Sequence, residues 1–180
     1  VRQTRAIIGE KLPLDIHRMK SGDQLFDWQV PREWLIRDAF IADDTGRRIV
    51  DFNHNNLHVV NFSVPIRTRM SLTELRDHIH TLPEQPDCIP YRTCYHNADW
   101  GFCMAHNALL QMQDDHYQVV IDAEHREGWL VYGEFIHKGS SKDVFVISTH
   151  LCHPSLANDT CSGMALARCL GGAFKRRHTR

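Results

Sequence analysis

The sequence of 180 residues lacks the features that mark membrane, secreted and nucleic-acid-binding proteins. Its longer apolar runs, such as Val144-Phe145-Val146-Ile147, fall far short of the roughly 20 residues that a membrane span needs. No charged segment followed by an apolar one opens the chain, so no secretion signal is expected. Neither sign of charge dominates, because 21 basic residues face 22 acidic ones. We therefore expect a cytoplasmic protein with neither nucleic-acid nor membrane partners.

Two motifs are also missing. No Cys-x-x-Cys pair occurs among the six cysteines, which argues against a structural zinc site built from four cysteine ligands. A chain of this length buries a core without disulfides, so six reduced thiols are predicted. No Gly-x-Ser-x-Gly motif is present, which argues against an α/β-hydrolase.

The residues that are present describe a globular chain with many histidines. Hydrophobic residues make up 42% and charged residues 24% of the sequence, the mixture of an ordinary folded domain. There are 13 histidines, well above the usual share. Most are expected to lie scattered on the surface, but histidine is also the commonest metal ligand.

Local patterns predict a hairpin-rich middle. An Asp43-Asp44-Thr45-Gly46 turn between two apolar runs predicts a hairpin of residues 35–42 and 47–52. Ser71 and Glu74 have the spacing of a capping box, which predicts a helix over 72–80. The remaining expected elements are a strand over 57–66, a short helix over 104–112, and a second hairpin of 117–123 with 129–136.

The last forty residues change to an α/β pattern. Residues 143–149 form a continuous apolar run, typical of a strand buried on both faces of a parallel sheet, and a helix is expected from Asp159 to Arg177. The predicted fold is α/β, a parallel or mixed sheet with helices, interrupted by a β-rich α+β insertion. The predicted domains are 1–44, an inserted domain over 45–140, and 141–180, where the first domain resumes.

The loop after residue 149 concentrates side chains that bind metals. His150, Cys152, His153 and Asp159 stand within ten residues, at the expected carboxyl end of a strand where ligands bind in open α/β folds. A plainer interpretation also fits, with Asn158 or Asp159 as a helix N-cap and His153-Pro154 as a turn.

A resemblance favours the metal interpretation. The pattern Thr149-His150, Ala157-Asn158-Asp159-Thr160 and Ser162-Gly163 resembles the metal loop of the zinc-dependent aminopeptidase superfamily, in which the fold is zinc-exopeptidase-like. The chain is also similar to a narrower group, bacterial and archaeal aminopeptidase-like proteins of poorly defined function that carry an inserted small β-rich domain. Further motifs carry this similarity along nearly all of the chain: Ser21-Gly22, residues 27–34, residues 57–60, Leu82-Pro83, Ile89-Pro90-Tyr91 and residues 100–103.

The resemblance implies two zinc ions, with His150 as a ligand of one and Asp159 as the carboxylate that bridges both. Cys152 stands where the superfamily has an aspartate that orients the histidine, and His153 is an extra ligand or a substrate contact. The implied reaction is hydrolysis of a peptide or amide bond by water activated between the ions. The resemblance also implies a context in polysaccharide biosynthesis, with a peptide or an amide-bearing small molecule as substrate; a homo-oligomer stays open.

The superfamily's general-base glutamate and its remaining ligands come later than Arg180, and the chain does not begin with Met. The sequence therefore resembles an N-terminal fragment that has no catalytic residue of its own and is inactive alone. The alternative is a non-catalytic aminopeptidase-like scaffold or binding module. A second open question concerns Trp28 with Trp34, and Tyr95 with residues 100–102, which form either an aromatic platform for a sugar or peptide or part of a core.

Overall fold

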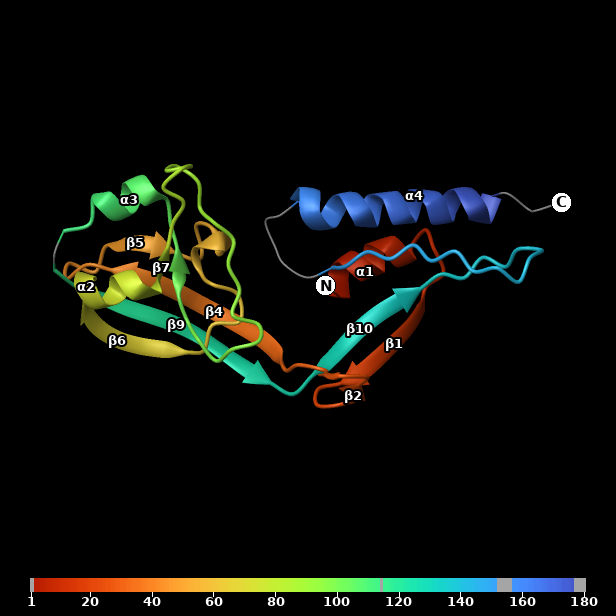
Figure 1. Ribbon diagram of the computed structural model, residues 1–180, viewed down its shortest axis with the longest axis horizontal. Coiled ribbons are helices and arrows are strands. Elements are labelled where there is room, and N and C mark those ends of the chain that lie inside the picture. The colour runs from red at the N-terminus through yellow and green to blue at the C-terminus, as the bar shows by residue number, and fades with distance from the viewer. Residues whose placement is uncertain (1, 114, 152–156, 177–180) are drawn as a thin grey trace. The chain divides into compact units, whose positions relative to one another are not determined.

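The computed structural model describes residues 2–113, 115–151 and 157–176, whose contacts divide the chain into two compact units (Figure 1). One unit is Arg32–Gly128, and the other combines Val1–Pro31 with Trp129–Arg180. The architecture is mixed α/β, with small sheets that are mostly antiparallel. Within the described parts of the chain, no helix is both long enough and apolar enough to cross a membrane.

The unit Arg32–Gly128 is built on a four-stranded antiparallel sheet with the order β5-β4-β9-β6. Its strands are β4 (Glu33–Ala42), β5 (Arg48–Asp51), β6 (Ile66–Ser71) and β9 (His116–Arg126). The predicted hairpin of 35–42 with 47–52 is confirmed, because β4 and β5 pair antiparallel. The Asp43 carboxylate closes the turn by accepting hydrogen bonds from the backbone N–H groups of Thr45 (3.0 Å) and Arg47 (3.1 Å).

The core of this unit lies on one face of the sheet. Successive side chains of a strand point to opposite faces, and in β9 the alternate residues Val119, Ile121 and Ala123 are buried while Asp122 and Glu124 are partly exposed on the other face. Buried residues from the short elements cover this apolar face and complete the core. They include Leu72, Leu75, Ile79, Phe102, Met104 and Leu109.

Those short elements are η1 (Asn56–His58), α2 (Leu72–Leu75), η2 (Arg76–His78), β7 (Ile79–His80), β8 (Phe102–Cys103) and α3 (His106–Leu110). The predicted capping box is confirmed: Glu74 N–H donates to Ser71 Oγ (3.3 Å), and Ser71 N–H donates to the Glu74 carboxylate (2.9 Å). The helix predicted over 72–80 is shorter, since its last two residues form β7 and pair parallel with β8.

The strand predicted over 57–66 is wrong. That stretch holds η1 and isolated bridges at Val59 and Asn61, and β6 begins only at Ile66. Pro65, just before β6, has no N–H to donate to a sheet. The helix predicted over 104–112 is present as the shorter α3.

The second unit contains α1 (Arg2–Gly9), β1 (Asp15–Lys20), β2 (Gln24–Leu25), β3 (Trp28–Gln29), β10 (Trp129–Glu134), the π-helical turn η3 (Ala157–Cys161) and α4 (Ser162–Arg176). β1 and β10 pair antiparallel as a two-stranded ribbon. Helix α4 packs on Leu12, which is 4% exposed. A Cβ atom added to Gly171 would lie only 2.9 Å from Leu12 Cδ1, so this glycine permits the close packing. Together η3 and α4 correspond to the predicted helix from Asp159, whose last predicted residue, 177, lies outside the described residues.

The predicted hairpin of 117–123 with 129–136 is wrong. β9 pairs with β4 and β6, whereas β10 pairs with β1. The short Glu127-Gly128 connection thus joins strands of different sheets. Alternation in a sequence identifies a strand but does not identify its partner, and here the long-range partners prevail.

The strand predicted over 143–149 is absent from the structure as described. Val144, Phe145 and Val146 are 83%, 93% and 77% exposed, and no described strand pairs with them. A strand of a parallel sheet draws its stability from neighbouring strands and from covering layers on both faces, and the described residues supply neither. Parallel pairing between named strands is confined to β7 with β8 in the described chain. The separate insertion over 45–140 stays a prediction.

Candidate functional site

The structure brings together two of the predicted zinc ligands, His150 and Asp159. The Nε2 atom of His150 lies 3.5 Å from Oδ1 of Asp159, and the two side chains are 59% and 49% exposed. Two ligands that each lie about 2.1 Å from a tetrahedral zinc ion are about 3.4 Å apart. The observed spacing therefore suits two ligands of one ion as well as a simple ion pair.

Local structure explains how residues nine positions apart meet. Asp159 belongs to the π-helical turn η3, which directly precedes α4, and His150 lies in the described segment without helix or strand that follows β10. The Ser162 hydroxyl donates a hydrogen bond to the carbonyl oxygen of Asn158, which secures the turn. π-Helical turns are rare and are found frequently at functional sites.

Gly163 lets the start of α4 approach the segment that carries His150. A Cβ atom added at this position would lie 2.5 Å from Oγ1 of Thr149, a distance that real Cβ atoms do not adopt. Thr149 directly precedes His150, and Gly163 lies one helical turn beyond Asp159. The Ser-Gly pair of the motif thus has a steric reason to stand beside the histidine and the aspartate.

The other two candidate residues, Cys152 and His153, lie outside the described residues. Among the residues that are described, no group of three or more His, Cys, Asp or Glu side chains is placed to hold a metal ion. His150 and Asp159 supply an imidazole nitrogen and a carboxylate oxygen, which are zinc-binding donors, but two ligands are fewer than the three that a catalytic zinc needs. The pair therefore fits as part of a zinc site, and its role as a ligand pair stays a prediction.

The aromatic residues divide between core and surface. Phe102 is fully buried, and Trp100 stacks on His78 with ring centroids 3.8 Å apart. Trp34 and Tyr95 both contact Phe62, at centroid distances of 5.8 Å and 4.7 Å. Trp34 and Tyr95, which the sequence analysis treated separately, thus belong to one half-buried cluster, while Phe102 belongs to the core.

Burial makes two of the described thiols less reactive. Cys88, Cys94, Cys103, Cys161 and Cys169 are free. Burial raises the pKa of Cys103 to about 12, and it also raises the pKa of Cys94. A buried thiol of high pKa is a poor nucleophile, because the thiolate is the reactive form.

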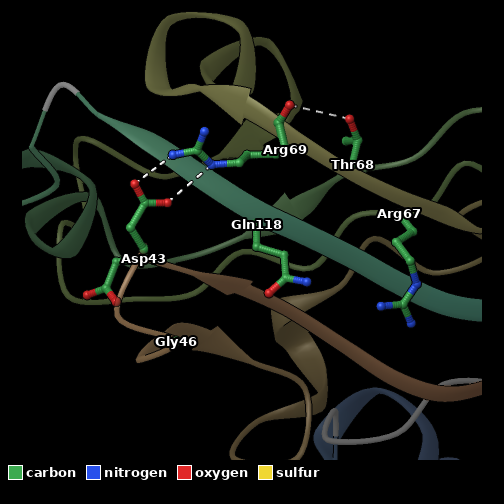
Figure 2. A pocket seen from close by; sticks show the side chains of 7 residues that line it. Asp43, Gly46, Arg67, Thr68, Arg69 and Gln118 are labelled. Atoms are coloured by element: carbon green, nitrogen blue, oxygen red, sulfur yellow. Dashed lines mark hydrogen bonds and ion pairs between the residues drawn. The ribbon is translucent and has the colours of Figure 1, made fainter.

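A second candidate site lies on the charged face of the four-stranded sheet, where the sequence analysis placed no functional residue. A hollow of about 310 Å³ is lined by Asp43, Asp44, Gly46, Arg67, Thr68, Arg69 and Gln118 (Figure 2). Arg67 and Arg69 alternate in β6 and lie on this face, because Arg67 is opposite Val120 and Arg69 opposite Gln118. The available signal was the Arg-Thr-Arg alternation, which the expected strand over 57–66 left out.

Ion pairs fill most of this face. The Arg37 guanidinium donates to Asp122 (2.6 Å) and to Glu124 (3.1 Å), and these hydrogen bonds are the main reason that the pKa of Arg37 is raised. The same contact lowers the pKa of Asp122. Arg69 donates to Asp44 at 2.6 Å, which raises the pKa of Arg69. These arginines are already neutralised by carboxylates.

Comparison with known proteins identifies the sheet unit. Residues 33–124 match a domain of unknown function, DUF2172. The chain belongs to the DUF2172 family. The matched residues fall within the unit Arg32–Gly128, so His150 and Asp159 lie outside the part that defines this DUF2172 chain.

Two relatives extend the comparison to the whole chain. A Clostridium acetobutylicum protein named "Putative polysaccharide biosynthesis protein with aminopeptidase-like domain" is 42% identical over 180 residues. A crystal structure from the same organism, described as a "putative peptidase", matches 97% of this chain with a TM-score of 0.90 and 42% identity. The DUF2172 chain spans 42% of the length of each relative. The names of these relatives, which mention an aminopeptidase-like domain, polysaccharide biosynthesis and a peptidase, agree with the resemblance seen in the sequence.

Proposed function

We propose that the DUF2172 chain is part of an aminopeptidase-like hydrolase that uses two zinc ions to cleave a peptide or amide bond. The observation that carries the proposal is the 3.5 Å approach of His150 Nε2 to Asp159 Oδ1 beside the start of α4. The names of the two relatives support an aminopeptidase-like protein with a role in polysaccharide biosynthesis.

His150 and Asp159 have distinct tasks in this proposal. His150 holds one ion through Nε2 and must be neutral to do so, because a protonated imidazole nitrogen has no lone pair to donate. Asp159 would help to hold the ions through its carboxylate, and its negative charge would offset the repulsion between two cations. Zinc held by these residues would supply Lewis-acid chemistry, by which a scissile carbonyl is polarised and a water is activated.

The rest of the machinery comes from outside the 180 residues. The superfamily's general base and remaining ligands have no match in this sequence, and the chain spans 42% of each relative's length. Two assigned ligands, or four if Cys152 and His153 are included, give weak and labile metal binding. We therefore expect the chain alone to bind metal without hydrolysing a substrate.

A cobalt titration tests the ligand pair. Co²⁺ replaces Zn²⁺ in such sites and reports its ligands by visible absorption. We expect weak binding by the chain that falls at least about tenfold in His150→Ala and in Asp159→Asn, because even the loss of a group that only orients a ligand costs about 10–100-fold in metal affinity. His54→Ala removes an exposed histidine elsewhere and should leave the titration unchanged. Equal binding by all three variants would show that His150 and Asp159 are not ligands of the metal.

A hydrolysis assay tests the division of the machinery. The purified chain, with added zinc or cobalt, is expected to show no turnover of aminoacyl-anilides. Turnover that disappears in His150→Ala would show that the 180 residues form a working enzyme, contrary to this proposal.

The second candidate function is a non-catalytic aminopeptidase-like binding module. The observation in its favour is that the DUF2172 match ends at residue 124, before His150. In the longer protein, hydrolysis that depends on His150 supports the enzyme, whereas an inactive protein that keeps its fold supports the binding module.

A further inference from the structure

Two hollows meet at Arg67 on the charged face of the four-stranded sheet. The first, of about 310 Å³, is mainly polar, with Thr68 and Gln118 in its lining. The second, of about 230 Å³, is lined mainly by apolar residues that include Ile66 and Val120. Arg67 contributes to the lining of both. The combined space is within the range of small-molecule sites.

Arg67 differs from its neighbours in having no carboxylate of its own. Arg37, Arg48 and Arg69 are each paired with aspartate at 2.6–2.7 Å. No hydrogen bond or ion pair joins the exposed Arg67 guanidinium to another residue in the parts of the chain that the structure describes. Its donors are therefore available to a ligand.

The carboxylate of Asp122 does not occupy the N–H donors of Arg67. The pKa of Asp122 is lowered mainly by the hydrogen bonds that Arg37 donates to it. The positive charge of Arg67 makes a smaller contribution. The Arg37 side chain donates twice to the same Asp122 oxygen, at 2.6 Å and 3.0 Å. Asp122 thus holds Arg37, and Arg67 retains its planar fork of N–H groups.

Figure 2 shows how the side chains are directed. Arg67 and Gln118 extend from adjacent strands toward the same side, whereas Arg69 turns away to Asp44. Gln118 adds an amide donor and acceptor on the same face of the sheet as the guanidinium. An arginine binds carboxylate and phosphate groups with two parallel hydrogen bonds, and the Gln118 amide suits the hydroxyl groups of a sugar.

We propose that the hollow at Arg67 binds an acidic saccharide through its carboxylate or phosphate group. Arg67 contacts the anion, Gln118 contacts sugar hydroxyls, and Val120, on the same face of the sheet, faces the C–H surface of the ring. The inference that the ligand is an anion rests on the hollow alone. The saccharide part rests on the polysaccharide context of the proposed function.

The test is an NMR titration of the ¹⁵N-labelled 180-residue chain with four probes: glucuronate, glucose 6-phosphate, neutral glucose and inorganic phosphate. We expect saturable shifts of the Thr68 and Gln118 amide signals with glucuronate, glucose 6-phosphate or both, and none with glucose. A response to one acidic sugar identifies the carboxylate or the phosphate as the recognised group. Glucose binding as tightly as the acids would overturn the anionic part, and inorganic phosphate binding as tightly as glucose 6-phosphate would overturn the saccharide part.

Three variants assign the effect to Arg67. Arg67→Gln should weaken binding about tenfold, the loss expected for charge-assisted hydrogen bonds. Arg67→Lys keeps the charge but loses the planar fork of N–H groups, so its affinity should lie between those of the original chain and Arg67→Gln. Arg126→Gln makes the same charge change at an arginine that is paired with Glu33, away from the hollow, and should bind as the original does.

Unchanged affinity in Arg67→Gln, with the remaining spectrum preserved, would overturn the proposal. Asp159→Asn separates the two sites, because loss of metal binding there should leave this titration unchanged.

Discussion

Gly163 sets the geometry of the candidate metal centre because it has no side chain. Its Cα faces Thr149 so closely that a methyl group would overlap the threonine hydroxyl. Thr149 precedes His150 and Gly163 follows Asp159, so the contact ties the two halves of the candidate site together.

Replacing this glycine should be costly. Gly163→Ala is expected to destabilise the chain by about 1 kcal/mol, the cost of forcing the Thr149 side chain off its preferred rotamer to make room for the methyl group. Chemical unfolding monitored by circular dichroism measures the change. The same variant should weaken cobalt binding, because it separates Thr149 and His150 from α4.

A matched control lies in the same helix. Nothing is within 4 Å of a Cβ atom added to Gly172, so Gly172→Ala should stabilise α4 by up to about 1 kcal/mol through helix propensity. The double variant Gly163→Ala with Thr149→Ala removes the clash and should recover most of the lost stability. If Gly163→Ala and Gly172→Ala raise the free energy of unfolding equally, the close approach of Gly163 to Thr149 is contradicted.

The contact between Arg37 and Asp122 predicts a dependence of stability on pH. Hydrogen bonds from Arg37 lower the pKa of Asp122 in the folded state. The folded chain therefore binds a proton at Asp122 less readily than the unfolded chain does, so the contact stabilises above the unfolded pKa of about 3.9 and is lost as the pH falls through the folded pKa. Urea midpoints should be nearly constant from about pH 7 to 5 and decline below about pH 4.

Variants of the pair isolate its share of this decline. Asp122→Asn and Arg37→Gln should each make the decline shallower, and the double variant should add little to Arg37→Gln, since that variant already removes the contact with Asp122. A decline that is identical in the original chain and in both single variants would contradict the assignment.

Local sequence signals predicted those elements whose decisive contacts are local. The turn at residues 43–46 and the Ser71 capping box need only neighbours in the sequence, and both are present. The partners of β9 and β10 could not be predicted in the same way. Both strands pair with segments far away in the sequence, and alternation carries no information about that choice. The apolar run of 143–149 likewise does not form a strand without neighbours.

The capping box provides a test at the scale of one element. Ser71→Ala removes the acceptor for the Glu74 N–H and should destabilise the unit Arg32–Gly128 by about 1 kcal/mol. Urea unfolding measures the difference. Ser140→Ala, at an exposed position outside helices and strands, should change stability by less than about 0.5 kcal/mol. Equal effects of the two variants would show that the cap does not stabilise the fold.

At the scale of the whole molecule, the DUF2172 match and the contacts define nearly the same unit. The match covers residues 33–124 and the compact unit is Arg32–Gly128. The insertion predicted over 45–140, with the strand of 35–42 in the first domain, stays a prediction. In the structure that strand, β4, pairs with β5 and β9.

The unit Arg32–Gly128 is expected to fold alone, because it contains its own sheet and core. Expressed separately, it should give dispersed amide signals by NMR and a single cooperative unfolding transition. A collapsed spectrum without a cooperative transition would mean that the second unit is required for folding.

The candidate site was predictable only as far as its motif reaches. The Thr149-His150 and Asn158-Asp159 pattern led to two residues that the structure places 3.5 Å apart. Arg67 was not found, because its significance depends on which other arginines have carboxylate partners across the sheet. Such pairing is a property of strand register, which the sequence alone did not reveal.

The most direct test of the central claim is a crystal structure of the chain grown with zinc, with anomalous diffraction data collected on both sides of the zinc absorption edge. The account predicts an anomalous peak between His150 Nε2 and the Asp159 carboxylate, about 2.0–2.2 Å from each. A zinc peak elsewhere, with His150 and Asp159 pointing to different faces, would contradict it.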